Sequence, residues 1–328
     1  MIISRTPLRL SFAGGGTDLP GYYMQNANHG AVVSSAIDWY IYFTVNKKFD
    51  DLIRVSYSKT ELVEHVDELE HNIIRESMKI AGVDKGVDIV CIADIPLTTA
   101  GIGLGSSSAL AVGVLNALYA LKGQHVSAER LAREACKVEM EMLKHPMGKQ
   151  DQFAAAYGGL NFIQFNNDES VFVDPVICKP ETKRTLSSKL MLFYTGITRH
   201  SSVILQEQEE SIDNCLDHHH KLVELANEMK ERLCKNDLSA FGELLHEGWT
   251  YKRKLASKIS NSQIDEWYQK ARDAGALGGK IAGAGGGGFL LLYCDEDKQD
   301  KVRSALSEMK SYAVDLESQG SKIIYVSD

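Results

Sequence analysis

The sequence has no long apolar run, few prolines and no low-complexity segment. Six prolines are spread over 328 residues. A membrane helix needs about eighteen or more consecutive apolar residues, which the chain does not contain, and the N-terminal MIISRTPLRLSF lacks the apolar centre of a signal peptide. These absences predict a folded protein of the cytoplasm with no membrane partner.

An excess of basic residues and closely spaced cysteines are also missing. The formal net charge is −8 and the isoelectric point is about 5.7, whereas a nucleic-acid-binding domain usually carries a basic face. The six cysteines form no CxxC pair, so they are expected to be free thiols in a reducing compartment rather than disulfides or zinc ligands. Nucleic acid is therefore not an expected partner.

The amino-acid composition of the chain is typical of a globular protein. Hydrophobic residues make up 44% and charged residues 24%, and the length exceeds what one ordinary core accommodates. The sequence becomes polar around residues 180–190, so we predict a first domain over 1–183 and a second over 184–328. The sequence alone leaves a homodimer open.

Strand and helix patterns are mixed in both halves, which predicts an α+β protein. Alternating or β-branched segments predict strands over residues 1–12, 31–46, 87–94, 160–173, 190–196, 289–294 and 322–326. Helices are predicted over residues 60–81, 109–121, 127–144, 202–233 and 238–255, and from 262 onward. Ser127 supplies a start signal, because a serine side chain can accept a hydrogen bond from an unpaired amide of the first turn.

The most informative segment is PLTTAGIGLGSSSA, residues 96–109, in which a glycine loop leads directly into a helix that begins with serines. Backbone N–H groups at a helix N-terminus have no partner inside the helix and carry the positive end of its dipole. Glycines let a phosphate approach the backbone, and serine hydroxyls can donate to it or bind a metal. The segment therefore predicts a phosphate-binding loop. Its expected binding residues are Gly101, Gly103, Leu104, Gly105, Ser106, Ser107 and Ser108.

Two other phosphate motifs do not fit the chain. The dinucleotide fingerprint needs GxGxxG, whereas the loop glycines give GxGxG. A Walker A loop needs GxxxxGK followed by serine or threonine, whereas Gly279-Lys280 is followed by Ile281. The loop therefore belongs to a different class of phosphate binder.

Two carboxylates have positions that call for an explanation. Glu139 falls in the middle of the apolar arc of the helix predicted over 127–144, so it needs a partner. Its spacing leaves a buried arginine and a metal ion equally open. Asp151 lies in GKQDQFAAAYGG, residues 148–159, where a helix N-cap and a general base are both open.

Together these segments resemble the GHMP kinase superfamily, which includes galactokinase, homoserine kinase, mevalonate kinase and phosphomevalonate kinase. Its three motifs are similar, in order, to TPLRLSFAGGGTD (residues 6–18), the loop 96–109 and KIAGAGGGGF (residues 280–289). The resemblance covers almost the whole chain. It implies an N-terminal lobe like ribosomal protein S5 domain 2, a C-terminal ferredoxin-like lobe and an active site between them.

Within the superfamily the sugar 1-kinases match best. Galactokinases have a glutamate that helps to bind magnesium and, twelve residues later, a catalytic aspartate followed by Gln-Phe; Glu139 and Asp151 have this spacing, and Gln-Phe follows here too. The resemblance thus implies ATP and Mg²⁺ as cofactors, Ser107 with Glu139 as metal ligands, and Asp151 as the catalytic base or positioning group. Arg9 matches the galactokinase arginine and is expected to stabilise Asp151 and the transferred phosphoryl group.

The substrate side departs from galactokinases in one place. Where they have Glu-His before Thr-Asp, this chain has Gly15 and Gly16 ahead of Thr17 and Asp18, and Asp18 matches the aspartate that holds sugar hydroxyls. The missing side chains leave room for a larger, negatively charged sugar. The forms GGGTDLPGYY, YTGITRHSS and LLHEGWTYKR resemble the D-glycero-D-manno-heptose 7-phosphate kinases. That resemblance implies transfer of a phosphoryl group to the anomeric hydroxyl of this sugar phosphate.

The sugar's own phosphate would need cationic partners. Arg199, beside Ser201 and Ser202, is the first candidate, and Lys149 and Arg253 are the others. The resemblance also leaves two alternatives, a 1-kinase of a neutral sugar such as L-fucose or galactose and a non-catalytic sugar sensor. Turnover of ATP would separate the kinases from the sensor.

Overall fold

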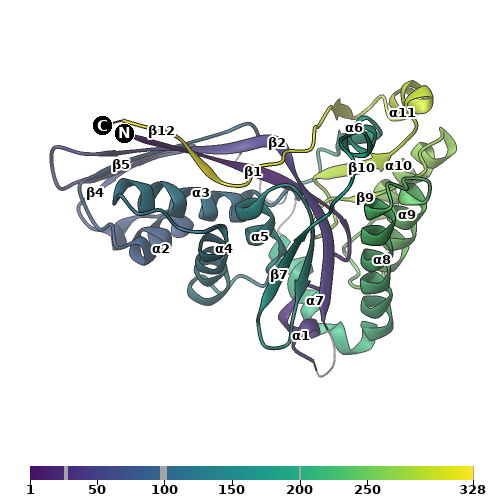
Figure 1. The fold of residues 1–328 in the computed structure, drawn as a ribbon, viewed down its shortest axis with the longest axis horizontal. Helices are drawn as coiled ribbons and strands as arrows, with labels where there is room; N and C mark the ends of the chain where they lie inside the picture. The colour runs from purple at the N-terminus through teal and green to yellow at the C-terminus, as the bar shows by residue number, and fades with distance from the viewer. Residues whose placement is uncertain (26–28, 97–101, 199–200, 328) are drawn as a thin grey trace.

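The computed structural model describes residues 1–25, 29–96, 102–198 and 201–327. Its strands form two sheets in two lobes, with helices in both (Figure 1). The strands are β1 (Ile2–Ala13), β2 (Gly30–Lys47), β3 (Ile53–Ser56), β4 (Thr60–Val63), β5 (Val87–Ala93), β6 (Leu160–Phe165), β7 (Val171–Pro175), β8 (Leu190–Tyr194), β9 (Gly278–Ile281), β10 (Phe289–Tyr293), β11 (Lys310–Tyr312) and β12 (Lys322–Val326). The helices are α1 (Pro20–Tyr23), α2 (Asn72–Ala81), α3 (Ser106–Leu121), α4 (Ala128–Cys136), α5 (Gln150–Tyr157), α6 (Pro180–Ser188), α7 (Ser201–Glu210), α8 (Leu216–Cys234), α9 (Phe241–Lys252), α10 (Ser262–Asp273) and α11 (Gln299–Ala305).

The larger sheet is built around the long strand β2. Its strand order is β12-β1-β2-β5-β3-β4, and β2 also pairs with β6, which pairs with β7. The first part of β2 pairs with β6 through residues 30–35, and the last part pairs with β5 through residues 41–47. Helices α2 to α5 lie along one face of this sheet in Figure 1. This sheet and its helices form the first lobe.

Strand β1 is buried on both of its faces where it approaches the centre of the molecule. Leu8, Leu10 and Phe12 are at most 1% exposed, and side chains alternate between the faces of a strand. Arg9 and Ser11 therefore point to the opposite face, and both are also buried. A buried arginine requires a partner, and this one is described below.

The central helix α3 explains how the glycine loop is held. It packs against β1, β2, α2, α4 and α5, so nearly every side chain after its first turn is buried. Gly105 is its N-cap and has φ 73°, a left-handed conformation that favours glycine. The serines form the first turn of the helix, as the sequence pattern predicted, and the apolar run from residue 109 continues it.

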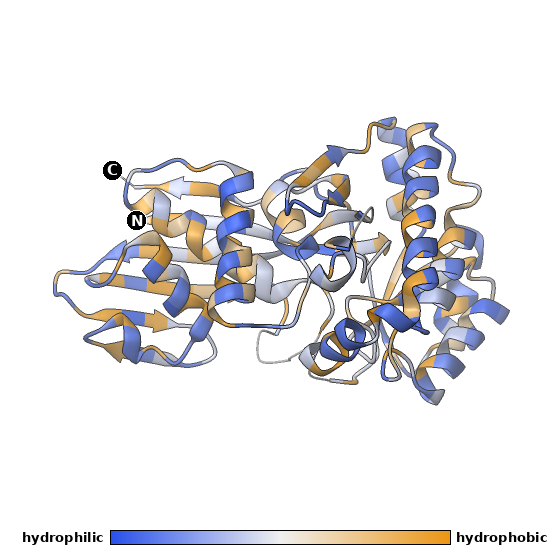
Figure 2. Cartoon of the chain, turned by 90° about the horizontal axis from the view of Figure 1, so that it is seen from below, coloured by the Kyte–Doolittle hydropathy of each residue, from blue (hydrophilic) through white to orange (hydrophobic). Residues whose placement is uncertain are grey.

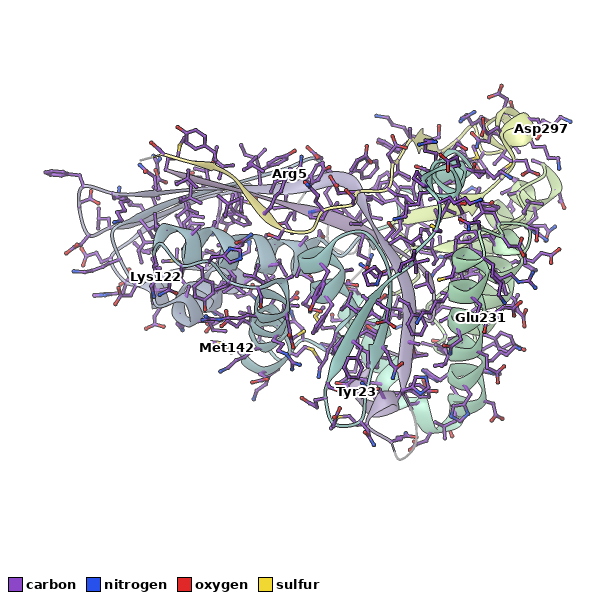
Figure 3. The ribbon with its side chains drawn as sticks, viewed as in Figure 1. Arg5, Tyr23, Lys122, Met142, Glu231 and Asp297 are labelled. Atoms are coloured by element: carbon purple, nitrogen blue, oxygen red, sulfur yellow. The ribbon has the colours of Figure 1, made fainter. Side chains whose placement is uncertain are left out.

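The second lobe contains the smaller sheet, of order β11-β8-β10-β9. Its core includes Phe193, Trp249 and Trp267, packed between the sheet and its helices. In Figure 2 hydrophilic residues run along the outer helices, and Figure 3 shows the exposed side chains of Glu231 and Asp297 pointing away from the body.

The end of the chain returns to the first lobe, where β12 pairs with β1. A division into 1–183 and 184–328 remains a prediction, and this pairing adds that residues 322–326 complete the first sheet. Within the described residues, every helix is too short or too polar to cross a membrane.

Most predicted elements are present, but the helix predicted over 60–81 is wrong in its first half. Residues Thr60–Val63 form β4, which pairs antiparallel with β3, and α2 starts only after His71, whose side chain caps it. The helix predicted over 127–144 starts at the Ser127 cap, where Oγ accepts from the Arg130 amide at 3.2 Å. It is α-helical to Cys136 and then a π-helix over Lys137–Met142.

Candidate active site

A cavity of about 570 Å³ lies between the lobes and collects most of the predicted site residues. The first lobe contributes the glycine loop, Arg9, Asp18 and Asp151. The second lobe contributes Ser201, Ser202, Lys252, Gly283 and Ala284. Three segments that are distant in the sequence, the end of β1, the loop before α3 and the glycine run after β9, meet here.

The glycine loop is held against the third glycine segment, backbone to backbone. Gly103 has φ 88°, and a Cβ at this position would lie 2.4 Å from the carbonyl oxygen of Ala282. A Cβ on Gly283 would lie 2.7 Å from the Cα of Gly103. Only glycines allow this approach. The contact brings the first turn of α3, with its unpaired N–H groups, to the cavity wall.

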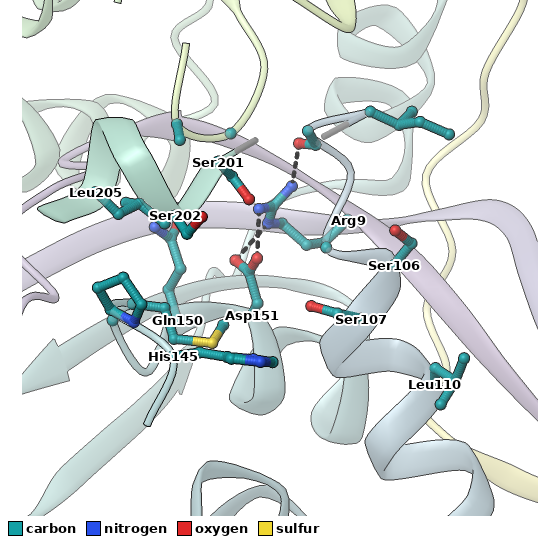
Figure 4. Close-up of a pocket in the computed structure, with 18 of the residues that line it drawn as sticks. Arg9, Ser106, Ser107, Leu110, His145, Gln150, Asp151, Ser201, Ser202 and Leu205 are labelled. Carbon is teal, nitrogen blue, oxygen red and sulfur yellow. Dashed lines mark hydrogen bonds and ion pairs between the residues drawn. The ribbon is translucent and has the colours of Figure 1, made fainter. Parts of the chain in front are cut away.

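Arg9 and Asp151 form a two-pronged ion pair on the floor of the cavity. Arg9 Nε donates to Asp151 Oδ1 at 2.7 Å, and a terminal nitrogen donates to Oδ2 at 2.6 Å. The remaining terminal nitrogen donates to the carbonyl oxygen of Gly103 at 2.6 Å, and the Arg9 amide donates to the carbonyl oxygen of Leu104 at 3.1 Å. A bidentate pair fixes both planes. Arg9 therefore aligns the Asp151 carboxylate with the glycine loop (Figure 4).

Glu139 is fully buried beside the first turn of α3. Its Oε2 accepts from Ser108 Oγ and from Gln152 Nε2, both at 2.7 Å. Burial raises the pKa of Glu139 to about 7, and the nearby hydroxyls of Ser108 and Ser107 and the Gln152 amide partly oppose this rise. The buried arginine that the sequence left open is not the partner, since neutral groups hold Glu139.

The surroundings of Glu139 fit a magnesium ion. Its Oε1 is buried and lacks a hydrogen-bond partner, and the Ser107 hydroxyl lines the cavity next to it. In Figure 4 Ser107 points into the space that Asp151 also faces. Carboxylate and hydroxyl oxygens suit Mg²⁺, which keeps several waters and binds substrate phosphates. The donor set is therefore adequate, while no cluster of three or more His, Cys, Asp and Glu side chains occurs within the described residues.

Asp18 is a further carboxylate that lines the cavity. Its Oδ1 accepts from the Gly16 amide and from Gln150 Nε2, both at 3.0 Å. Burial raises its pKa, and the charge of Asp151 adds to the rise. A Cβ on Gly148 would lie 2.0 Å from Asp18 Oδ2, so glycine at 148 is needed for this placement.

The outer end of the cavity is lined by residues that the sequence did not indicate. They are Tyr57, Ser58, His71, Ile73 and Leu110. The rings of Tyr57 and His71 meet edge to face with centroids 4.7 Å apart, and burial lowers the pKa of His71. These residues include two aromatic rings and two aliphatic side chains, unlike the charged Arg9, Asp18 and Asp151 on the floor.

The domain matches are consistent with these observations. Residues 68–159 match the GHMP kinases N terminal domain, and residues 229–311 match GHMP kinases C terminal. A D-glycero-alpha-D-manno-heptose 7-phosphate kinase of Campylobacter jejuni is 30% identical over 331 residues, covering 96% of this chain and 95% of the relative. The chain belongs to the GHMP kinases.

Two further similarities place this GHMP kinase among its relatives. An L-fucokinase/L-fucose-1-P guanylyltransferase of Bacteroides fragilis is 28% identical over 94% of this chain, which spans only 36% of that relative. The crystal structure of a D-glycero-D-manno-heptose 1-phosphate kinase from Bacteroides thetaiotaomicron superposes with a TM-score of 0.82 over the whole of both chains at 24% identity, which shows the shared fold. The two-lobed fold is confirmed, and the protein is a sugar kinase with ATP as the phosphoryl donor.

Some of the predicted site residues of this GHMP kinase line the cavity, and others support it from behind or lie elsewhere. Arg9, Gly16, Asp18 and Asp151 line the cavity, as do these loop residues: Gly103, Gly105, Ser106 and Ser107. Ser108 instead supports Glu139, and Leu104 supplies only its carbonyl oxygen to Arg9.

The remaining predicted substrate and phosphate residues lie elsewhere. The Thr17 hydroxyl is used by the backbone: it donates to the Gly14 carbonyl oxygen at 2.8 Å and accepts from the Ala31 amide at 3.0 Å. Gly101 and Arg199 lie outside the described residues. Lys149 pairs with Glu169 at 3.4 Å and Arg253 with Asp265 at 3.0 Å, and neither Lys149 nor Arg253 lines the cavity.

Proposed function

We propose that this GHMP kinase transfers the γ-phosphoryl group of ATP to the anomeric hydroxyl of D-glycero-D-manno-heptose 7-phosphate, giving the 1,7-bisphosphate. The observation that carries the proposal is the Arg9–Asp151 pair, which lies between the glycine loop and Asp18. The similarity to the heptose 7-phosphate kinase over nearly the full length of both chains supports the choice of sugar.

The ATP phosphates would lie against the first turn of α3. The unpaired N–H groups there and the hydroxyls of Ser106 and Ser107 can donate to phosphate oxygens. The adenine would extend to the outer end, against Tyr57, His71 and Leu110, because a flat aromatic base suits an apolar wall with ring edges. Phosphate at one end and base at the other match the shape of the nucleotide.

Ser107 and Glu139 would hold Mg²⁺, and Ser106 is the alternative candidate for the serine ligand. The ion, when bound, neutralises charge on the phosphate oxygens during transfer. Glu139 is already desolvated, so a cation would remove the cost of ionising it. The role of this chain is to keep that carboxylate oriented through Ser108 and Gln152.

Asp151 would act on the sugar, which Asp18 positions. A bond forms between the anomeric oxygen and the γ-phosphorus, and the bond from that phosphorus to the bridging oxygen of ADP breaks. The hydroxyl proton passes to a carboxylate oxygen of Asp151, or is oriented by it. Arg9 keeps Asp151 in place and lies close enough to the glycine loop to interact with the transferred group.

The first experiment is a coupled ADP-release assay with D-glycero-D-manno-heptose 7-phosphate, mannose 6-phosphate, galactose, L-fucose and mevalonate. The proposal expects strong turnover with the heptose phosphate alone. Faster turnover of galactose or L-fucose would refute the proposed substrate but keep the sugar kinase, and the fucokinase relative makes L-fucose the informative competitor.

A further inference from the structure

Lys280, on β9, is a buried lysine whose charge has no partner. It is 5% exposed, and its ammonium makes no hydrogen bond or ion pair with any of the described residues. Ionised side chains are almost never buried unless paired, because burial removes their hydration. The folded chain therefore bears a cost at Lys280 that, among the described residues, only the nearby charge of Asp18 partly offsets.

The surroundings of Lys280 contain further polar groups without partners. A Cβ on Gly15 would lie 3.9 Å from Lys280 Nζ, 3.9 Å from Gln150 Nε2 and 3.6 Å from Ser11 Oγ. Both Ser11 Oγ and Gln150 Oε1 are buried and lack hydrogen-bond partners. Glycine at 15 thus leaves a small space bordered by polar atoms. Buried polar atoms normally find a partner, so this space is suited to a polar ligand.

A second buried lysine connects this space to the cavity. Lys252, at the end of α9, lines the cavity and donates to the Gly15 carbonyl oxygen and to Gln208 Oε1, both at 2.9 Å. A Cβ on Gly16 would lie 3.0 Å from Lys252 Nζ. Both glycines at the turn therefore keep side chains away from lysine ammonium groups.

The charges around the turn sum to an excess of positive charge. Arg9 comes from β1, Lys252 from α9 and Lys280 from β9, and the facing carboxylates are Asp18 and Asp151. Burial lowers the pKa of Lys280 to about 7, repulsion from Lys252 and Arg9 adds to the fall, and Asp18 opposes it. A bound anion would offset the repulsion among these positive charges, since it supplies the missing counter-charge.

We propose that Lys280 and Lys252 bind the phosphate monoester that the sugar substrate already carries, with the Ser11 hydroxyl donating a further hydrogen bond to it and Gln150 Oε1 accepting from a hydroxyl of the sugar. The inference rests on the proposed function, because it assigns the distal end of the same acceptor. It replaces Lys149 and Arg253, whose charges are paired outside the cavity. A neutral hydroxyl is a weaker match for two ammonium groups than a phosphate dianion.

The test compares Lys280→Met and Lys252→Met with wild type on a matched pair of acceptors, D-glycero-D-manno-heptose 7-phosphate and the same heptose without its phosphate. We expect wild type to prefer the phosphorylated sugar. Each variant should lose about tenfold to a hundredfold in kcat/KM on the phosphorylated sugar, mainly through KM. The preference between the two sugars should fall by the same factor. Lys254→Met, an exposed lysine two residues beyond Lys252, is the control and should keep the wild-type preference.

The outcomes separate the two proposals. A wild type that turns over the unphosphorylated heptose, galactose or L-fucose as well as the heptose phosphate would overturn the phosphate site and leave a sugar kinase. A wild type inactive on every sugar would overturn the proposed function itself. Variants that lose activity equally on both sugars would also overturn the site, since they would show a general rather than a phosphate-specific role.

Thermal unfolding gives an independent readout. Replacing a lysine that stabilises the fold should destabilise the protein, whereas replacing an unpaired buried ammonium by an apolar side chain should stabilise it. We expect Lys280→Met to unfold at a higher temperature than wild type without ligand, and the heptose phosphate to raise the unfolding temperature of wild type more than that of the variant. A lower unfolding temperature for Lys280→Met would contradict the inference.

Discussion

At the scale of single residues, the site depends on buried charges whose partners come from distant parts of the sequence. Arg9 and Asp151 are 142 positions apart and share two hydrogen bonds. Asp151 is not unusual in isolation, since an aspartate in a first helical turn is common. Their pairing on the cavity floor is the observation that supports a reaction site here.

Replacing Asp151 with asparagine should nearly abolish turnover and leave ATP binding intact. The amide cannot accept the proton and breaks half of the bidentate pair with Arg9. We expect kcat to fall by about a hundredfold or more while the KM for ATP changes little, measured by ADP release at saturating sugar. Asp84→Asn, in an exposed loop, should retain wild-type kinetics. Near-full turnover of Asp151→Asn would exclude Asp151 as base or positioning group.

The stability of Lys280→Met relative to wild type should depend on pH. The pKa of Lys280 falls from 10.5 to about 7 on folding, so between these values the unfolded chain binds more protons and wild-type stability rises with pH. The difference in unfolding free energy between Lys280→Met and wild type should therefore be greatest at pH 7 and below. It should shrink toward pH 10, by at most about 1.4 kcal/mol per pH unit. Denaturant unfolding at pH 6, 7, 8 and 9 measures it. A constant difference would mean that Lys280 does not titrate in this range.

At the scale of elements, contact between two glycine segments fixes the loop before α3. Gly103→Ala should disturb it, because a methyl group would meet the Ala282 carbonyl oxygen and φ is 88°. We expect a loss of about 1–3 kcal/mol in unfolding free energy, measured by denaturant unfolding. We also expect at least a tenfold rise in the KM for ATP, measured by steady-state kinetics.

Gly123→Ala is the matched control for that substitution. Gly123 follows the same helix and has φ 72°, but a Cβ there would meet nothing within 4 Å. It should show the cost of the left-handed conformation, about 1 kcal/mol, with an unchanged KM for ATP. Equal effects of the two substitutions on the KM for ATP would argue against the packing role of Gly103.

The elements also show what sequence patterns can and cannot predict. Glycines next to serines before an apolar helix predicted a glycine turn that leads into α3, since this pattern is local; phosphate binding by the loop stays a prediction. The strand β4 was missed because Thr60–Val63 is followed closely by a true helix, and its pairing with β3 is not visible in its own residues. That error also concealed Tyr57 and His71, which lie on either side of β4 and line the cavity.

Partners of buried groups were harder to predict than the groups themselves. The apolar arc correctly marked Glu139 as buried, but Ser108 and Gln152 as its partners depend on how α3 and α5 pack. The sequence placed Lys280 in a rejected Walker motif and at the start of the third family motif, without a role of its own. Its burial follows from the placement of β9 at the edge of a sheet against α9, which no periodicity reveals.

At the scale of the whole molecule, the last strand links the end of the chain to its beginning. β12 pairs with β1 from Ile2↔Val326 to Arg5↔Lys322, and β1 carries Arg9. Without β12, one edge of β1 would be open to other chains.

Removal of residues 322–328 should therefore lower stability and promote association. We expect the unfolding temperature to fall by about 5 °C or more and light scattering to increase with concentration, while the folded fraction keeps its preference among sugars. Truncation after Val326 retains the pairing and should behave like the full chain. An unchanged unfolding temperature for the longer truncation would show that β12 adds little to the first sheet.

The attachment of Arg9 to the glycine loop has a consequence for how new acceptors could be accommodated. Arg9, Asp151, Asp18 and the glycine loop before α3 all belong to the first lobe, and hydrogen bonds within that lobe hold Arg9 to Asp151 and to the loop. The second lobe reaches the turn mainly through Lys252 and Lys280. If Lys252 and Lys280 bind the acceptor as proposed, we expect substitutions at these two positions to change which sugar is accepted while the Arg9–Asp151 pair is retained, so that selectivity would be adjusted apart from the proposed chemistry.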